Sequence, residues 1–121
     1  MQRRHIIQWG AAALTAVSLG TASAQSFPAK PVKLVIAFPA GGPTDITMRA
    51  LADNASKILG QPVIVENKPG AGGRIALESL KAAPADGSVM ALAQVSALAN
   101  YPHIYSKMNY TDKDFAPVSI G

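Results

Sequence analysis

Three apolar runs stand out along the chain, each bounded by glycine or proline residues. The first, "VKLVIAF" at residues 32–38, is almost continuously apolar and rich in β-branched residues. Such a run is typical of a strand buried on both faces of a parallel sheet. The runs "QPVIVEN" at residues 61–67 and "SVMALA" at residues 88–93 predict two further strands.

A helix is predicted between the first two strands, from about Pro43 to the residue before Gly60. Gly42 or Thr44 is the candidate N-cap, and Asp45 lies in the first turn, where the helix dipole favours an acid. Gly60 is typical of a helix C-terminus. Apolar residues near helical spacing predict one packed face, made of Ile46, Ala50, Leu51, Ala55, Ile58 and Leu59. The opposite face is expected to be exposed and carries Arg49, Asp53, Asn54 and Lys57.

A second helix is predicted at residues 74–83, with Ile75, Leu80 and several alanines available for packing. The "PADG" segment at residues 84–87 is typical of a tight turn. Strands that alternate with helices indicate an α/β fold, with a mostly parallel sheet flanked by helices and right-handed connections. Beyond residue 93 the pattern predicts only a helical turn before Pro102, a loop, and the start of a strand at Val118.

Two glycine-rich turns, at residues 40–44 and 70–73, each follow a predicted strand and precede a predicted helix. In an open parallel sheet both turns would lie at the carboxyl ends of neighbouring strands, where such folds bind ligands. The unpaired N–H groups of two helix starts, together with the helix dipoles, favour an anion there. The alternative is that either turn is only a tight connector.

A carboxylate fits these turns better than a phosphate does. Neither turn is a Walker loop, because no Lys-Ser or Lys-Thr pair follows the glycines. "GAGGR" is not the GxGxxG dinucleotide motif, and Glu66 precedes that turn instead of following it. A carboxylate needs only a few donors, so we expect a small organic acid as the anion.

Residues 1–24 have the order of a secretory signal peptide: Arg3 and Arg4, then an apolar segment, then Ala22-Ser23-Ala24 as a cleavage site. The apolar segment is shorter than the roughly 20 residues of a spanning helix. "RRHII" also resembles a twin-arginine signal, so export by either the Sec or the Tat route stays open. Periplasmic localisation is expected.

The remaining chain, from residue 25 to residue 121, carries a small positive charge. Nine basic residues remain against seven acidic ones once the first 24 residues are removed. The lysines are scattered and no aromatic residues interleave with them, which argues against a nucleic-acid partner. The chain has no cysteine, which excludes disulfides and a lipid-modified cysteine. A free product that is not embedded in the membrane is expected.

No set of residues with catalytic or metal-binding spacing appears. His103 is the only histidine after residue 24 and lies in an aromatic loop, so a surface or packing role is favoured. Ser96 lacks a nucleophile-elbow context, and no carboxylate pair or His/Asp cluster has metal-ligand spacing. Asp112 and Asp114 flank Lys113 in what is predicted to be a solvated turn. No cofactor, metal or enzymatic activity is expected.

From residue 27 onward the chain resembles the Bug-type extracytoplasmic solute receptors, the substrate-binding proteins of tripartite tricarboxylate transporters. The segments "PAGGPTD", "LGQPVIVENKPGAGG", "APADG" and "KDFAPVS" carry the resemblance, in that order. It implies a periplasmic binding protein of type II, with two lobes that close on a small carboxylate. The chain would hold the amino-terminal part of lobe 1, at residues 25–121, with the second lobe absent.

The resemblance also implies the residues that bind the ligand. One ligand carboxylate would lie near both glycine turns, held largely by main-chain groups and water. The expected contacts are Phe38, Ala40, Gly41, Gly42, Thr44, Asp45, Ala71, Gly72 and Gly73. Arg74 follows the second turn where the family commonly has a small or amide residue, so it would either add a cation near the site or face solvent.

The favoured hypothesis is a monomeric receptor that captures a di- or tricarboxylate, or a related organic acid, and presents it to membrane transporter subunits. Two alternatives stay open. One is an exported α/β enzyme that uses the same cleft and takes its catalytic groups from a missing half. The other is a truncated lobe that acts as a sensor or interaction module.

Overall fold

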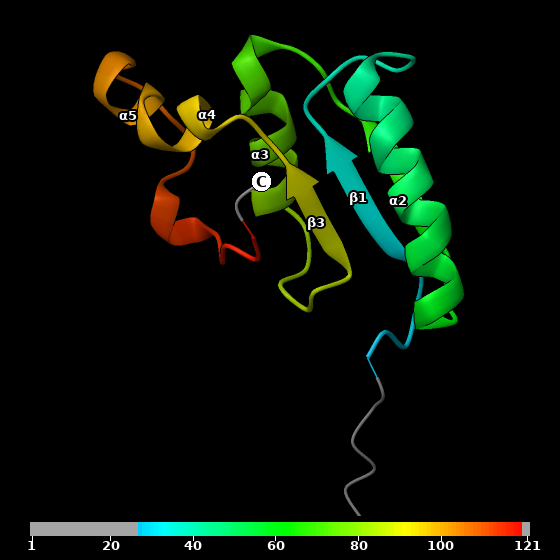
Figure 1. The fold of residues 1–121 in the computed structure, drawn as a ribbon. Helices are drawn as coiled ribbons and strands as arrows, with labels where there is room; N and C mark the ends of the chain where they lie inside the picture. The colour runs from blue at the N-terminus through cyan, green and yellow to red at the C-terminus, as the bar shows by residue number, and fades with distance from the viewer. Residues whose placement is uncertain (1–26, 120–121) are drawn as a thin grey trace, which may run out of the picture.

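The computed structural model describes residues 27–119, and the predicted signal peptide lies outside them. Its centre is a sheet of three parallel strands, β1 (Val32–Ile36), β2 (Val63–Asn67) and β3 (Val89–Leu92), in the order β2-β1-β3. Figure 1 shows β1 and β3 side by side. The parallel α/β arrangement predicted from the sequence is confirmed. β1 ends earlier than predicted, so that Ala37 and Phe38 belong to the turn that follows it.

β1 is the central strand because its residues are apolar on both faces. Val32, Val35 and Ile36 are almost completely buried. The two strands beside it are only half-buried on average and form the sheet's edges in the part of the chain that the structure describes. Parallel strands buried on both faces favour such continuous apolar runs.

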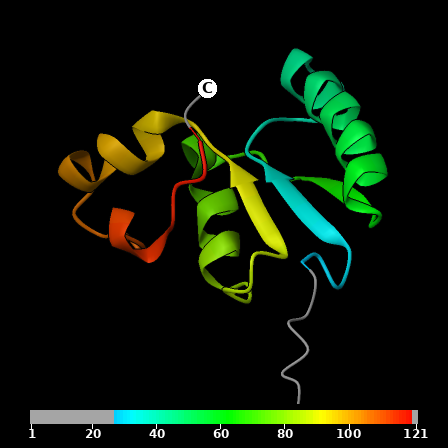
Figure 2. The same cartoon turned by 60° about the horizontal axis from the view of Figure 1, so that its bottom comes forward.

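Helices cover both faces of the sheet (Figures 1 and 2). The helix α3 (Arg74–Lys81) packs with Ala76 against Val35 of β1, on the face that also carries Glu66. Side chains alternate along a strand, so Asn67 points to the other face. The helix α2 (Pro43–Leu59) lies on that other face, since Arg49 reaches the side chain of Asn67.

The ends of α2 agree with the sequence. Gly42 is the N-cap, with φ −78° and no side-chain cap, so the alternative of Thr44 is wrong. Gly60 ends the helix with φ 66°, the left-handed conformation that glycine adopts easily. Pro43 occupies the first helical turn, where a missing N–H has no cost.

The prediction of which residues of α2 pack against the rest of the protein is wrong. Ile46, Leu51 and Ile58 are 63%, 54% and 85% exposed, whereas Ala52 and Asp45 are buried. The small Ala52 side chain lets the helix approach the sheet closely, and Asp45 turns toward the preceding loop. The hydrophobic spacing alone did not distinguish the side that meets the sheet from the neighbouring apolar stripe.

α3 uses small residues at its contact with the sheet. Ala76 and Leu77 are buried, while Ile75, which was expected to pack, is about half exposed. The helix ends at Lys81, two residues before the predicted boundary. A difference of this size is ordinary for helix ends.

Two short helices follow β3, where the sequence predicts one helical turn. They are α4 (Val95–Ala99) and α5 (Tyr101–Ile104), which carries Pro102 in its first turn. The chain then returns beside α3 (Figures 1 and 2). Tyr110 is buried in a cluster with Leu77, and its hydroxyl donates to the Ala97 carbonyl at 2.9 Å.

The return segment is tied to α3 by polar contacts as well. Lys81 lies 2.9 Å from the Asp114 carboxylate, which also accepts the N–H of Thr111 at the start of the 3₁₀ helix η2 (Asp112–Asp114). Asp114 is thus a capping residue with an ion pair and not part of a merely solvated turn. Residues 115–119 are irregular, so the strand predicted to start at Val118 does not begin there. Between residues 27 and 119, no helix has both the length and the apolar character to cross a bilayer.

Candidate functional site

The two glycine-rich turns meet at the carboxyl edge of the sheet. The Lys68 N–H, just after β2, donates to the Ile36 carbonyl at the end of β1 at 2.8 Å. A Cβ placed on Gly73 would lie 3.4 Å from the Cβ of Ala37, which is van der Waals contact across the two turns. Residues 37–44 and 70–73 therefore lie side by side.

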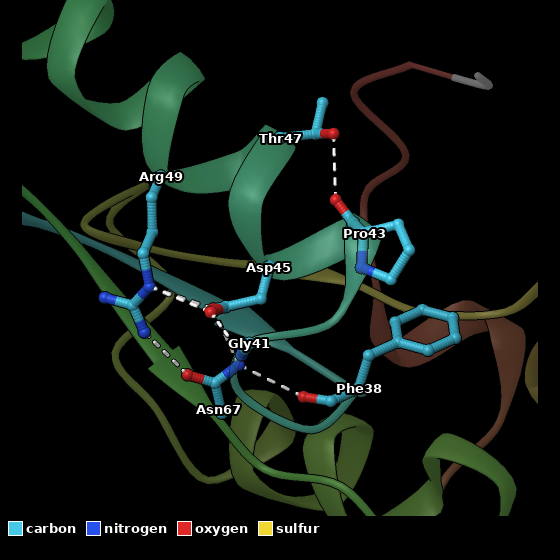
Figure 3. Close-up of polar contacts among 7 residues, drawn as sticks. All are labelled: Phe38, Gly41, Pro43, Asp45, Thr47, Arg49 and Asn67. Atoms are coloured by element: carbon cyan, nitrogen blue, oxygen red, sulfur yellow. Dashed lines mark hydrogen bonds and ion pairs between the residues drawn. The ribbon is translucent and has the colours of Figure 1, made fainter.

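The first turn is held from behind by the carboxylate of Asp45. This side chain is only 4% exposed and accepts hydrogen bonds from three protein donors (Figure 3). They are the Gly41 N–H at 2.8 Å, the Arg49 Nε at 3.0 Å and the Asn67 Nδ2 at 2.9 Å. Asp45 was expected to contact a ligand, but its oxygens are engaged inside the protein.

Asn67 connects the two strand ends and is a site residue that sequence reasoning missed. Besides Asp45, its amide donates to the Phe38 carbonyl at 3.1 Å, and its Oδ1 accepts from Arg49 Nη2 at 2.9 Å (Figure 3). The available signal was a polar residue that ends the apolar run "VIVEN". Such a residue falls at the carboxyl end of the strand, where the site lies.

These contacts control the ionisation of Asp45. The Arg49 guanidinium, followed by the N–H of Gly41 and the amide of Asn67, lowers the Asp45 pKa from 3.8 to about 2. Hydrogen bonds to an ionised carboxylate favour its charged form. The network is therefore complete at neutral pH and fixes the first turn against α2.

The first turn still presents main-chain donors. The Gly41 N–H is used by Asp45 and the Ile46 N–H bonds the Gly42 carbonyl at 3.0 Å. Between residues 27 and 119, the hydrogen bonds of the structure provide no acceptor for the N–H groups of Ala40, Gly42 or Thr44. Donors of this kind at a helix start attract an anion.

The second turn has an unusual backbone. Gly70, Ala71, Gly72 and Gly73 all have positive φ, at 117°, 48°, 65° and 94°. Ala71–Gly73 form the 3₁₀ helix η1, and the Gly73 N–H donates to the Gly70 carbonyl at 2.9 Å. Glycine suits such a run because left-handed backbone is costly for other residues.

Gly72 lies under an aromatic side chain from α5. A Cβ at this position would be 2.1 Å from the Tyr101 hydroxyl oxygen and 2.8 Å from the ring. The missing side chain at Gly72 thus makes room for Tyr101, another residue that sequence reasoning did not connect with the turn. The aromatic content of "NYPHIY" was the only hint.

Arg74 is held by an aromatic contact beside the second turn. Its guanidinium carbon lies 4.2 Å from the ring centroid of Tyr105, and its Nε donates to the Ala71 carbonyl at 3.2 Å. A cation over an aromatic face is favourable. Of the two roles left open, the structure therefore rejects a side chain that simply extends into solvent.

Two other polar candidates lie on the short helices that follow β3. His103 is exposed on α5, and Ser96 is half-buried in α4. Among residues 27–119, no group of three or more His, Cys, Asp or Glu side chains is placed to hold a metal.

A parallel sheet with helices on both faces and helix starts at its carboxyl edge occurs in many α/β proteins, and the lobes of periplasmic binding proteins are among them. The family model described as "Tripartite tricarboxylate transporter family receptor" matches residues 47–120. The chain belongs to this family, and the family assignment made from the motifs is confirmed.

Relatives with curated descriptions support the assignment. The chain is 52% identical over 97 residues to "UPF0065 protein in gbd 5'region" of Cupriavidus necator, covering 75% of this chain and 30% of that protein. It is 39% identical over 103 residues to "Protein BugT" of Bordetella pertussis, covering 81% and 31%. The chain thus spans about a third of the length of these relatives.

Solved structures agree with the fold. The Rhodopseudomonas palustris protein MatC, solved with bound malate, superposes with a TM-score of 0.67 at 34% identity, covering 76% of this chain and 32% of that one. R. palustris Rpa4515, solved with adipate, gives a TM-score of 0.64 at 31% identity and covers 72% and 29%. The expected periplasmic-binding-protein fold is therefore confirmed.

Proposed function

We propose that this chain is the amino-terminal part of lobe 1 of an exported solute receptor. In this proposal the receptor captures a small di- or tricarboxylate, or a related organic acid, in the periplasm. It then presents the acid to the membrane subunits of a tripartite tricarboxylate-type transporter. The observation that carries the proposal is the contact of two helix-start turns at one edge of the sheet. Among residues 27–119, no hydrogen bond uses the N–H groups of Ala40, Gly42, Thr44, Ala71 or Gly72.

The chemistry of these donors favours an acid. N–H groups at the start of a helix lie in the positive end of its dipole, so they bind a carboxylate better than a neutral group. α2 has 17 residues and begins directly at the first turn. The malate and the adipate with which two similar structures were solved support a carboxylate of this size.

In this proposal the nine predicted site residues have three roles. Five present main-chain or hydroxyl groups to the ligand: Ala40, Gly42, Thr44, Ala71 and Gly72. Phe38 supplies an apolar wall, since its ring is half-buried against the core. Gly41, Asp45 and Gly73 already have protein partners, so they hold the two turns in place.

The proposed role is capture without chemical change. The family description names a receptor, and the donors described above can hold an anion but offer no nucleophile or base. Export by residues 1–24, a monomeric state and delivery to transporter subunits complete the proposal.

Ligand-linked stabilisation tests the function. Malate at 100 times its dissociation constant should raise the free energy of unfolding of the complete receptor, with both lobes, by about 2.7 kcal/mol. The measurement is the urea unfolding curve with and without malate, adipate or citrate. The neutral diamide of malate serves as the matched control ligand and should give a much smaller shift.

The variant Gly42→Leu locates the ligand. Gly42 has φ −78°, and a Cβ there would meet only the Pro39 carbonyl at 3.6 Å, so the fold should persist. A leucine should nevertheless keep an acid away from the N–H groups of the turn and remove the stabilisation. Full stabilisation in this variant would place the site elsewhere, and no response of the complete receptor to any of the three acids would refute the function.

A further inference from the structure

We infer that Tyr101 is a ligand-binding residue of the receptor, and that its hydroxyl donates a hydrogen bond to a carboxylate oxygen held at the second turn. This inference rests on the proposed function and adds a side-chain donor to a site otherwise built from main-chain groups. Tyr101 comes from α5, about thirty residues after the turn that it covers.

The position of the hydroxyl is the first step. It lies so close to Gly72 that a Cβ there would be 2.1 Å from its oxygen. It therefore lies directly beside the second turn, next to the main-chain donors of Ala71 and Gly72. An acid bound to those donors would be within reach of the hydroxyl.

The Tyr101 hydroxyl is available to form a further hydrogen bond. No hydrogen bond of the Tyr101 hydroxyl occurs with any residue from 27 to 119, although the side chain is half-buried. The Tyr110 hydroxyl, which lies in the same aromatic region, is satisfied by the Ala97 carbonyl at 2.9 Å. A half-buried phenol gains from finding a partner for its polar end.

The ring is held in a defined orientation. Tyr101 packs edge to face on Tyr105, with centroids 5.3 Å apart and an interplanar angle of 81°. Tyr105 in turn carries the Arg74 guanidinium, which is bonded to the Ala71 carbonyl of the same turn. A donor placed by such contacts loses little conformational entropy when it binds.

The chemistry agrees with an anionic partner. A phenol hydroxyl can donate a hydrogen bond to a carboxylate oxygen. A hydrogen bond to a carboxylate is stronger than one to a neutral acceptor. Loss of this donor should therefore weaken the binding of an acid by about tenfold.

Two matched tyrosine variants test the inference in the purified full chain. Tyr101→Phe removes only the hydroxyl at the turn, so malate affinity measured by calorimetry should fall about tenfold while the unfolding midpoint stays close to that of the unaltered chain. Tyr110→Phe removes the buried bond to Ala97, so the midpoint should fall while malate affinity stays the same. The near-ultraviolet tyrosine signal should change on malate addition in Tyr110→Phe and lose that change in Tyr101→Phe.

The outcomes separate this inference from the proposed function. If the unaltered chain binds malate and Tyr101→Phe binds it equally well, the role of Tyr101 is refuted and the receptor function stands. If Tyr101→Phe binds malate more tightly, the side chain obstructs the turn, and the inference is again overturned. If the complete receptor, with both lobes, binds no acid among malate, adipate and citrate, the proposed function fails and takes the inference with it.

Discussion

The two glycine turns of the site achieve the same exposure of main-chain donors by different means. The first turn is fixed by polar contacts from behind, through Asp45 and Asn67, and the space around Gly41 is open. The second turn is fixed by close packing, with Gly73 against Ala37 and Gly72 beneath Tyr101. The first turn thus depends on polar contacts for its position, and the second depends on close packing.

This difference shows that the glycines of the two turns are needed for different reasons. Gly41 needs its positive φ of 81°, but a Cβ there would meet nothing within 4 Å. Gly72 needs both its φ of 65° and the absence of a side chain, because Tyr101 occupies the space. Glycine content alone therefore does not reveal whether a ligand or the protein itself requires the missing side chain.

The largest effect is expected from Gly72→Ala, compared with Gly41→Ala as its matched control. Both changes force alanine into left-handed backbone, which costs about 1 kcal/mol. Only Gly72→Ala adds a collision with Tyr101, so its total loss in the free energy of unfolding should be about 3 kcal/mol. Urea unfolding curves of the two variants measure the difference.

A double variant identifies the cause of that difference. The double variant Gly72→Ala/Tyr101→Ala has no collision. Gly72→Ala should therefore lower the free energy of unfolding less in a Tyr101→Ala background than in the unaltered chain. Two results would show that this packing does not hold the second turn. One is equal stability of Gly72→Ala and Gly41→Ala, and the other is simple additivity of the effects of Gly72→Ala and Tyr101→Ala.

A smaller effect is expected from Asp45→Asn, which tests the polar half of the comparison through its pH dependence. Folding lowers the Asp45 pKa from 3.8 to about 2, so the unfolded chain takes up a proton first as the pH falls. The Asp45 carboxylate thus stabilises the fold above about pH 4, and this contribution is lost as the pH falls toward about pH 2. Asp45→Asn should lower the free energy of unfolding at neutral pH and reduce the steepness with which it falls below about pH 4, here called the acid limb.

The control for this variant is Asp53→Asn, an exposed position on the same helix. It should leave the stability at neutral pH almost unchanged. Some acid dependence should remain in Asp45→Asn, because Lys33 lowers the pKa of Glu66 and the Thr111 N–H lowers that of Asp114. An acid limb in Asp45→Asn as steep as that of the unaltered chain would show that Asp45 does not secure the first turn.

The sheet was predictable because its information is local. The apolar run of β1 and the glycines at its end, together with Gly60 after α2, mark strand and helix boundaries by short-range physics alone. Parallel pairing then followed from the length of the connections, and the two turns fell at the same edge. The family motifs agreed with this local pattern.

The contacts that complete the site were not predictable in the same way. Asn67 and Tyr101 lie 22 residues beyond Asp45 and about 30 beyond Gly72, so only the folded chain shows which groups they meet. The prediction of which side of α2 packs was also wrong, because Asp45 is buried by a hydrogen-bond network that no hydrophobicity pattern describes. Periodicity reports which residues are apolar but does not say where polar side chains find partners.

The central claim, that an acid lies against the main-chain N–H groups of both turns, is tested most directly by nuclear magnetic resonance. Amide proton and nitrogen shifts of the labelled chain are followed while malate is added, with the neutral diamide as the control ligand. The account predicts the largest changes at Gly42, Thr44, Ala71 and Gly72, saturating together. Saturable changes confined to other parts of the chain, with these four amides unmoved, would contradict it.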